Sequence, residues 1–293
     1  MVSVIIPTYN RGDRISASIE SVLCQTYSDL ELWIVDDGSS DNTKEVVEKF
    51  VQRDDRVHYI CQENKGACAA RNLGISMAKG DYIAFQDSDD VWHTDKLEKQ
   101  LNALQKYNAN VCSCKMNRFN YREGAAKVYP DLSGGVIPTK LLLEKSLVST
   151  QTIVAERQVF QSHTFDENVK AKQDWDWVIR AAQDNVFCFA DQALVDVYLQ
   201  SDSITSKQDM QKELKILQYF YQKYHYLYES YPNMEVALLS AIAQNKTMQS
   251  SAYAEEFLKK YKITKSKKDL LRAFLSRICV LRTLILLKKR LHK

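Results

Sequence analysis

The sequence has little glycine and proline and no long apolar run. Only 8 Gly and 4 Pro occur in 293 residues, which argues against long flexible linkers, and no low-complexity segment or repeat is visible. No stretch reaches the ~18 uninterrupted apolar residues of a membrane-spanning helix. Met1 leads directly into the apolar run Val2–Ile6, so we expect no secretory signal peptide and a cytoplasmic protein.

Two nucleotide-binding motifs and a zinc motif are also missing. The absence of G-x-G-x-x-G after the first apolar run argues against a dinucleotide-dependent oxidoreductase, and the absence of G-x-x-x-x-G-K-[ST] against a P-loop NTPase. Cysteines number seven, and Cys112 and Cys114 have no second Cys or His pair nearby to complete a zinc site. We therefore expect reduced, buried thiols.

Positive charge is scarce in the body of the chain and concentrated at its end. Residues 264–293 hold ten Lys or Arg and one acidic residue, a net charge of +9, whereas residues 1–263 hold 30 basic and 36 acidic residues. An acidic body is not typical of a nucleic-acid binder. The basic tail is compatible with packing on the body, but its charge of +9 favours peripheral contact with the inner face of the cell membrane.

The first 110 residues alternate between strand and helix patterns. Short apolar runs predict strands, and apolar residues at helical spacing predict helices between them. The predicted strands are 2–6, 30–35, 56–60 and 81–86, and the predicted helices include 66–78, 95–107 and, later, 174–183. This order predicts an α/β fold with a mostly parallel central sheet and flanking helices, followed by a helical region from residue 207.

Polar clusters follow the first, second and fourth predicted strands. Because ligands of such sheets bind beyond the carboxyl ends of the strands, we expect residues 8–11, 36–41 and 87–90 to converge. Asp87, Asp89 and Asp90 repel one another, which a divalent cation would relieve. A capped, solvated turn explains the same triplet equally well.

The other two clusters offer groups for a nucleotide. Tyr9 supplies an aromatic face for a base and Arg11 a positive charge, whereas Asp37 has acceptor oxygens for a base or ribose. Residues 39–42 are better explained as a turn and helix start, with the N-cap at Ser40 or Asp41.

Four segments of the chain stand in a fixed order and spacing: Pro7–Arg11, Val35–Thr43, Asn64–Gly66 with Ala70–Gly74, and Gly80–Asp90. Together they resemble the family-2 glycosyltransferases, which are inverting enzymes with the GT-A fold. The resemblance is close over residues 1–110 and weaker to about residue 205.

The resemblance implies roles for individual residues. It places the nucleotide base against Pro7, Thr8, Tyr9 and Asp37, and Arg71 near the sugar or diphosphate. Asp87-Ser88-Asp89 corresponds to the Asp-x-Asp motif, with Asp89 as the main ligand of Mn²⁺ or Mg²⁺ and Asp87 assisting. Asp87 and Ser88 also contribute to nucleotide-sugar binding.

The catalytic base implied by the resemblance is Asp174. It shares a helix face with Trp177, Val178 and Ala181, where burial would raise the pKa of a carboxyl group. Asp176 lies on the other side of the helix, and we expect it to be a solvated charge paired with Arg180.

Two positions depart from the family pattern. Gln173 replaces the usual acidic residue before the base. Tyr198-Leu199-Gln200-Ser201 stands where many members have Tyr-Arg-x-His, so a basic phosphate contact is missing there.

The sequence thus predicts a GT-A catalytic domain over residues 1–205, with a nucleotide-sugar half (1–110) and an acceptor half (111–205), and a helical region over 206–293. The expected reaction moves a sugar from a nucleotide diphosphate, with uridine favoured by family habit. The acceptor is a glycan or lipid-linked glycan of bacterial surface-glycan assembly. A sugar nucleotidyltransferase and a non-catalytic nucleotide-sugar binder remain alternatives.

Overall fold

The computed structural model describes residues 1–120, 126–199 and 210–249, together with residues 259, 260, 262–264, 266 and 269. The chain divides into two compact units. The first comprises Met1–Leu142 and Ser146–Ser206, and the second comprises Leu143–Lys145 and Lys207–Lys293. Most of the predicted basic tail (264–293), including all of 270–293, lies outside the described residues, as do Gln200 and Ser201 of the departing stretch.

The predicted alternation of strands and helices in the first half is confirmed. The strands are β1 (Val2–Thr8), β2 (Leu30–Asp36), β3 (Val57–Cys61), β4 (Tyr82–Phe85), β5 (Val91–Trp92), β6 (Val111–Asn120), β7 (Ala126–Tyr129), β8 (Gly135–Ile137), β9 (Val154–Glu156) and β10 (Phe187–Leu199). The helices are α1 (Ile15–Leu23), α2 (Thr43–Arg53), α3 (Ala67–Met77), α4 (Lys96–Tyr107), α5 (Thr139–Glu144), α6 (Arg157–Ser162) and α7 (Gln173–Ala181).

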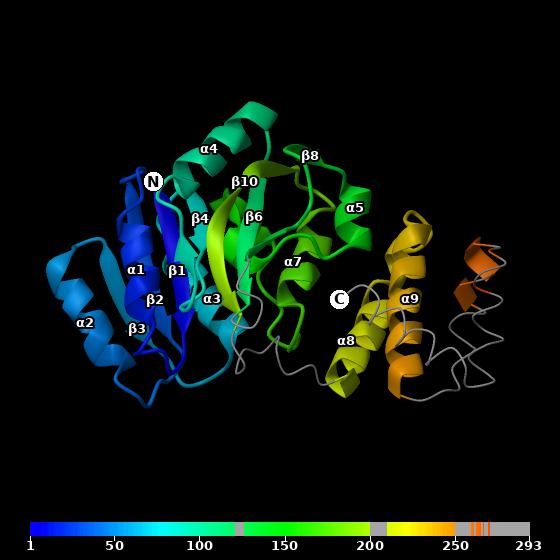
Figure 1. Ribbon diagram of the computed structural model, residues 1–293, viewed down its shortest axis with the longest axis horizontal. Coiled ribbons are helices and arrows are strands. Elements are labelled where there is room, and N and C mark those ends of the chain that lie inside the picture. The colour runs from blue at the N-terminus through cyan, green and yellow to red at the C-terminus, as the bar shows by residue number, and fades with distance from the viewer. Residues whose placement is uncertain are drawn as a thin grey trace. The chain divides into compact units, whose positions relative to one another are not determined.

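One sheet joins these strands in the order β3-β2-β1-β4-β9-β6-β10-β5, with β7 beside β6 and β8 beside β10 (Figure 1). Strands β1 to β4 are mutually parallel, and β6 is parallel to β10. The short strands β5, β7, β8 and β9 pair antiparallel with their neighbours. The register pairs Thr8 with Asp36, so the two polar strand ends lie side by side.

Alternate side chains of the central strands enter two apolar clusters, one on each face of the sheet. Val4 of β1 belongs to the cluster that α1, α2 and α4 cover, and its neighbour Ile5 belongs to the cluster under α3, α6 and α7. Because both faces of the sheet are buried, the sequences of its central strands are nearly continuous apolar runs. This packing holds the carboxyl ends of β1, β2 and β4 at one edge.

The described part of the second unit is helical, as predicted. It contains α8 (Met210–Lys223), a short 3₁₀ turn (His225–Leu227) and α9 (Pro232–Gln249). Apolar side chains such as Phe220 and Leu238 are buried, and the Tyr221 hydroxyl donates to Glu235 Oε1 over 2.8 Å. None of the helices in the described part of the chain combines the length and apolar character of a membrane span.

The six cysteines in the described part of the chain are free thiols. Cys112 and Cys114 are fully buried on the same face of β6, because alternate residues of a strand point to the same side. Burial raises the pKa of the Cys114 thiol to about 12, so it stays protonated and unreactive.

Candidate active site

Two loops at the carboxyl ends of β1 and β2 are joined into one surface. Asn10 adopts a left-handed backbone (φ 51°), and a Cβ at Gly12 would collide with Asn42. Four hydrogen bonds join the loops: Asn10 N to Ser39 Oγ, Ser40 N to Asn10 Oδ1, Arg11 N to Thr43 Oγ1 and Gly12 N to Asp41 Oδ2, at 2.8, 2.8, 2.9 and 3.1 Å. The predicted convergence of these two clusters is therefore correct.

The helix start in this region differs slightly from the expectation. The N-cap of α2 is Asn42, one residue after Asp41 and two after Ser40, the two predicted positions. Asp41 still supplies the capping contact, because its Oδ1 accepts the Thr43 backbone N–H over 3.0 Å while its Oδ2 is engaged by the neighbouring loop. The turn-and-cap explanation of residues 39–42 holds in this shifted form.

The end of β1 offers an exposed ring beside a buried hydroxyl. Pro7 is partly buried, and Tyr9, which follows the strand, is 48% exposed. Thr8 is buried, and its Oγ1 has no hydrogen-bond partner among the described residues. A buried hydroxyl without a partner costs free energy, so a ligand that bonds to it would be favoured.

Asp36 and Asp37 are both engaged by the protein. Asp36 accepts the Ser39 N–H and the Tyr59 hydroxyl, each at 2.8 Å, and is a structural residue. Asp37 is only 4% exposed, and donors from the loop after β3 contact both of its oxygens. They are Gln62 Nε2 and Lys65 N on Oδ1, and Gly66 N on Oδ2, at 2.7, 2.9 and 2.8 Å.

This saturation limits what Asp37 can do for a nucleotide. A carboxylate has about four acceptor positions, and three are already occupied. The remaining one is on Oδ2, which suits a single N–H or O–H donor from a base or ribose. Gln62 was not anticipated, because nothing in its local sequence indicates that its amide reaches the end of the neighbouring strand β2.

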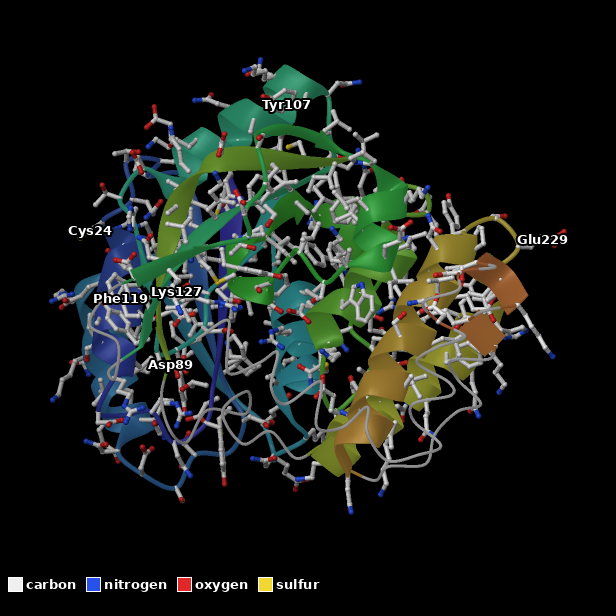
Figure 2. All side chains as sticks on the ribbon, turned by 45° about the vertical axis from the view of Figure 1, so that its right-hand side comes forward. Cys24, Asp89, Tyr107, Phe119, Lys127 and Glu229 are labelled. Atoms are coloured by element: carbon white, nitrogen blue, oxygen red, sulfur yellow. The ribbon has the colours of Figure 1, made fainter. Side chains whose placement is uncertain are left out.

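The acidic loop after β4 holds three carboxyl groups at this edge, and Figure 2 labels Asp89 there. Asp87 and Asp89 are half-buried, whereas Ser88 and Asp90 are buried. Burial, and then the Asp87 charge, raise the pKa of Asp89, and the nearby Arg11 charge lowers it. Burial and the charges of its two acidic neighbours raise the pKa of Asp90 well above its usual range.

Asp90 differs in role from the other two acids. Its carboxyl group accepts hydrogen bonds from the Tyr198 backbone, which ties the acidic loop to strand β10, and from the Gln151 side chain, which ties it to the 3₁₀ turn Thr150–Thr152. Gln86 Nε2 adds a 2.7 Å bond to the Asp90 carbonyl oxygen. Asp90 is thus used for structure, which leaves Asp87 and Asp89 open to a ligand.

Arg71 connects this loop with α7. It projects from α3, is 7% exposed, and its guanidinium lies 5.5 Å from the centre of the Phe165 ring. Its Nη2 donates to Asp87 Oδ1 over 3.3 Å, and its Nη1 donates to Gln173 Oε1 over 3.1 Å. The Arg71 side chain therefore links Asp87, predicted for donor binding, with Gln173, the residue before the predicted base Asp174.

Asp174 lies in the first turn of α7 and is half-buried. Its Oδ1 accepts the Trp175 N–H over 2.8 Å. Burial raises the pKa of Asp174; the Trp175 hydrogen bond and the Arg71 and Lys172 charges oppose that rise, and Asp87 adds to it. A carboxyl group with a raised pKa at a site edge has the character of a general base.

The expectation that Asp176 is a solvated charge is wrong. It is 1% exposed, although its predicted pairing with Arg180 is correct, with Asp176 Oδ2 3.1 Å from the guanidinium. The reason is that α7 is buried around most of its circumference, since both Trp175 and Trp177 are also buried. Asp176 is therefore a structural ion-pair residue, and Asp174 is the half-buried acid of this turn.

A divalent metal is compatible with this acid pair. No group of three or more His, Cys, Asp or Glu within the described ranges is arranged to hold a metal ion. Mg²⁺ is often bound through one or two carboxylates together with substrate phosphates and water, so three protein ligands are not required. Asp89, whose ionised form is disfavoured by Asp87, fits a cation, and the two together are the residues that could hold one.

Comparisons with known proteins identify the family and the fold of the chain. Residues 3–154, more than half of the chain, match the family model described as glycosyl transferase family 2. An uncharacterised glycosyltransferase of Rickettsia felis is 36% identical over 190 residues, which cover 63% of this chain and 31% of that protein. The chain thus spans about a third of the length of that relative.

A second relative has a more specific name. UDP-Glc:alpha-D-GlcNAc-diphosphoundecaprenol beta-1,3-glucosyltransferase WfgD of Escherichia coli is 38% identical over 170 residues. The matched region covers 56% of this chain and 64% of WfgD.

Two solved structures share the fold. TarS of S. aureus (1-349) in complex with UDP-GlcNAc has a TM-score of 0.63 at 17% identity, covering 96% of this chain and 89% of that one. Mannosyltransferase PcManGT of Pyrobaculum calidifontis in complex with GDP-Man and Mn²⁺ has a TM-score of 0.58 at 16% identity, covering 97% and 86%. The predicted GT-A type α/β fold is confirmed, and with the family model matched over more than half of its residues the chain belongs to glycosyl transferase family 2.

Proposed function

We propose that this chain transfers a sugar from a uridine diphosphate donor to a hydroxyl group of a lipid-linked glycan in bacterial surface-glycan synthesis. The observation that carries the proposal is the link through Arg71 between Asp87, at the donor edge, and the helix turn that bears Asp174. The E. coli relative named for a diphosphoundecaprenol-linked acceptor and the UDP-GlcNAc complex of TarS support the choice of substrates.

The donor is held by groups at the strand ends. Tyr9 stacks on the base, and Oδ2 of Asp37 accepts one N–H or O–H from the base or ribose, while Thr8 Oγ1 and Ser88 offer further polar contacts. Arg71 and Arg11 supply positive charge to the diphosphate. Asp89 and Asp87 would hold Mn²⁺ or Mg²⁺, which when bound supplies positive charge beside the leaving diphosphate.

Transfer takes place in a single displacement. Asp174 accepts the proton of the acceptor hydroxyl as that oxygen forms a bond to the anomeric carbon of the donor sugar. The bond between the anomeric carbon and the diphosphate oxygen breaks in the same step, and the nucleoside diphosphate leaves with the electron pair. Attack from the face opposite the leaving group inverts the anomeric configuration.

The test begins with ligand binding and ends with turnover. A thermal-shift panel of nucleotide sugars with and without Mn²⁺ identifies the donor, because a ligand that binds the folded state raises the melting temperature. The selected donor is then incubated with GlcNAc-diphosphoundecaprenol and the product is analysed by mass spectrometry. A product one sugar heavier is expected; pyrophosphate release from a nucleoside triphosphate, or binding without turnover on any acceptor, would contradict the proposal.

A further inference from the structure

Gln173, the first residue of α7, is fixed at both ends of its side-chain amide. Its Nε2 donates to the Val169 carbonyl oxygen over 3.1 Å, which orients the amide so that Oε1 faces the Arg71 guanidinium. The orientation follows from chemistry, since only the amide oxygen accepts the Arg71 N–H. Gln173 therefore contacts Arg71 through a neutral acceptor.

One carboxylate, Asp87, contacts Arg71 in the described part of the chain, and a second, Asp174, lies within electrostatic reach. Its contact with Asp87 is 3.3 Å, longer than the 2.7–2.9 Å typical of a charge-assisted N–H to carboxylate bond. Its Nε is buried and has no hydrogen-bond partner among the described residues. Arg71 is thus held in place by a neutral amide and one long carboxylate contact, which leaves much of its charge uncompensated.

We propose that Gln173 is a positioning residue that holds Arg71 without neutralising it, so that the guanidinium charge stays available to the donor diphosphate and to Asp174. This inference rests on the proposed function, in which Arg71 contacts the diphosphate and Asp174 accepts the proton. A carboxylate at position 173 would form a full ion pair with Arg71 and compete with the phosphates for it.

A carboxylate there would also change the surroundings of Asp174. The groups that act on Asp174 are Arg71 from α3, Asp87 from the loop after β4, Lys172 from its own segment and the Trp175 N–H. Tyr129 of β7 lies within electrostatic reach as well. The added negative charge and the pairing of Arg71 both disfavour the ionised form of Asp174. The transfer rate would therefore begin to rise at a higher pH.

The test compares Gln173→Glu with Gln183→Glu. Gln183 offers a matched control because its Nε2 makes the same bond to the carbonyl oxygen four residues earlier (Ile179, 3.1 Å) and the charge change is identical. We measure UDP affinity by calorimetry and transfer rate against pH for wild type and both variants. Gln173→Glu should weaken UDP binding about tenfold and move the acidic limb of the rate profile up by about one pH unit.

Gln183→Glu should leave both quantities within about twofold of wild type. Gln173→Ala adds no charge, so it should lower the rate through a displaced Arg71 and move the acidic limb up by less than Gln173→Glu does. This variant also covers the case in which Gln173→Glu is poorly folded. The inference would be overturned if the acidic limb of the rate profile lay at the same pH in all three variants. It would also be overturned if Gln173→Glu and Gln183→Glu bound UDP with equal affinity.

Failure of the proposed function gives a different result. If wild type binds UDP but transfers no sugar, the assigned reaction is wrong, and the affinity comparison still decides whether Gln173 sets the charge of Arg71. If wild type binds neither UDP nor any other nucleoside diphosphate, both the function and the inference are overturned.

Discussion

Arg71 donates through Nη2 to Asp87 Oδ1 across 3.3 Å, and this contact pairs a buried cation of α3 with the first acid of the loop after β4. The same guanidinium donates through Nη1 to Gln173 on α7. Three elements that are far apart in the sequence therefore meet at one planar side chain.

Arg71→Lys should weaken UDP binding about tenfold while leaving the protein folded. A lysine keeps the charge but cannot reach two partners with a planar fork, and a lost charge-assisted hydrogen bond costs ~1.5 kcal/mol. Calorimetry with UDP checks this. Arg53→Lys is the control, because Arg53 also lies over an aromatic ring, 4.7 Å from the centre of Phe50, on the unrelated helix α2. Equal affinity of the two variants would contradict the assigned role of Arg71.

Asp89→Asn should abolish transfer yet stabilise the metal-free protein at neutral pH. Burial and Asp87 raise the pKa of Asp89 in the folded state, so the stability that protonated Asp89 contributes at low pH is lost as the pH rises through that pKa. An amide is neutral throughout and avoids the loss. Melting curves at pH 7 with and without Mn²⁺ test this: Mn²⁺ should raise the melting temperature of wild type only. An equal Mn²⁺ response in Asp89→Asn would contradict the metal assignment.

Lys96→Met should raise the free energy of unfolding at pH 7 by about 1 kcal/mol. Burial lowers the pKa of Lys96 from 10.5 to about 8, a cost of roughly 3 kcal/mol for the charged form. The methionine gives up the contact of the ammonium with the Trp92 ring, whose centre lies 3.9 Å away, and the packing of the longer lysine chain, so only part of that cost should be recovered. Urea unfolding of both proteins measures the difference.

The pH dependence gives a sharper check of Lys96. Between about pH 8 and 10.5 the folded lysine is neutral while the unfolded one is protonated, so wild-type stability should rise relative to Lys96→Met. The advantage of the methionine variant should therefore disappear by pH 10. A constant difference across this range would mean that Lys96 is not held as a buried, desolvated ammonium.

Asp176→Asn should destabilise the fold without removing catalysis. The carboxylate is buried and pairs with Arg180, which is itself partly exposed, so we expect a loss of about 2 kcal/mol, below the range for a fully buried pair. Urea unfolding gives the stability, and transfer rates per folded molecule at 20 °C give the activity. An unchanged stability would show that the pair contributes little, and loss of activity in a folded variant would reverse the roles of the two acids.

The sequence predicts most of the first half of the fold because its signals are strong and local. The strand β1 is an almost wholly apolar run and α1 has an apolar face, so both follow from the sequence pattern. Strands β5 and β9 have two and three residues, too few to show any period, and they form only because longer strands accept them as neighbours. Their existence was not predictable from pattern alone.

At the site, the residue types were predictable and their partners were not. The acidic residues at the strand ends predict a polar edge of the sheet. Nothing near Asp37 in the sequence indicates that donors of Gln62, Lys65 and Gly66 occupy three of its acceptor positions. The helical spacing of Asp176 and Arg180 predicted their ion pair. It could not predict burial, which depends on the elements that surround α7.

The account depends most on Asp174 as the proton acceptor, and one comparison tests it directly. Initial rates of sugar transfer are measured for Asp174→Asn alongside UDP-sugar affinity by calorimetry. The predicted result is a rate loss of ~10²–10⁴-fold, the usual effect of removing a general base, with donor affinity nearly unchanged. Normal turnover by Asp174→Asn together with an inactive but folded Asp176→Asn would contradict the account.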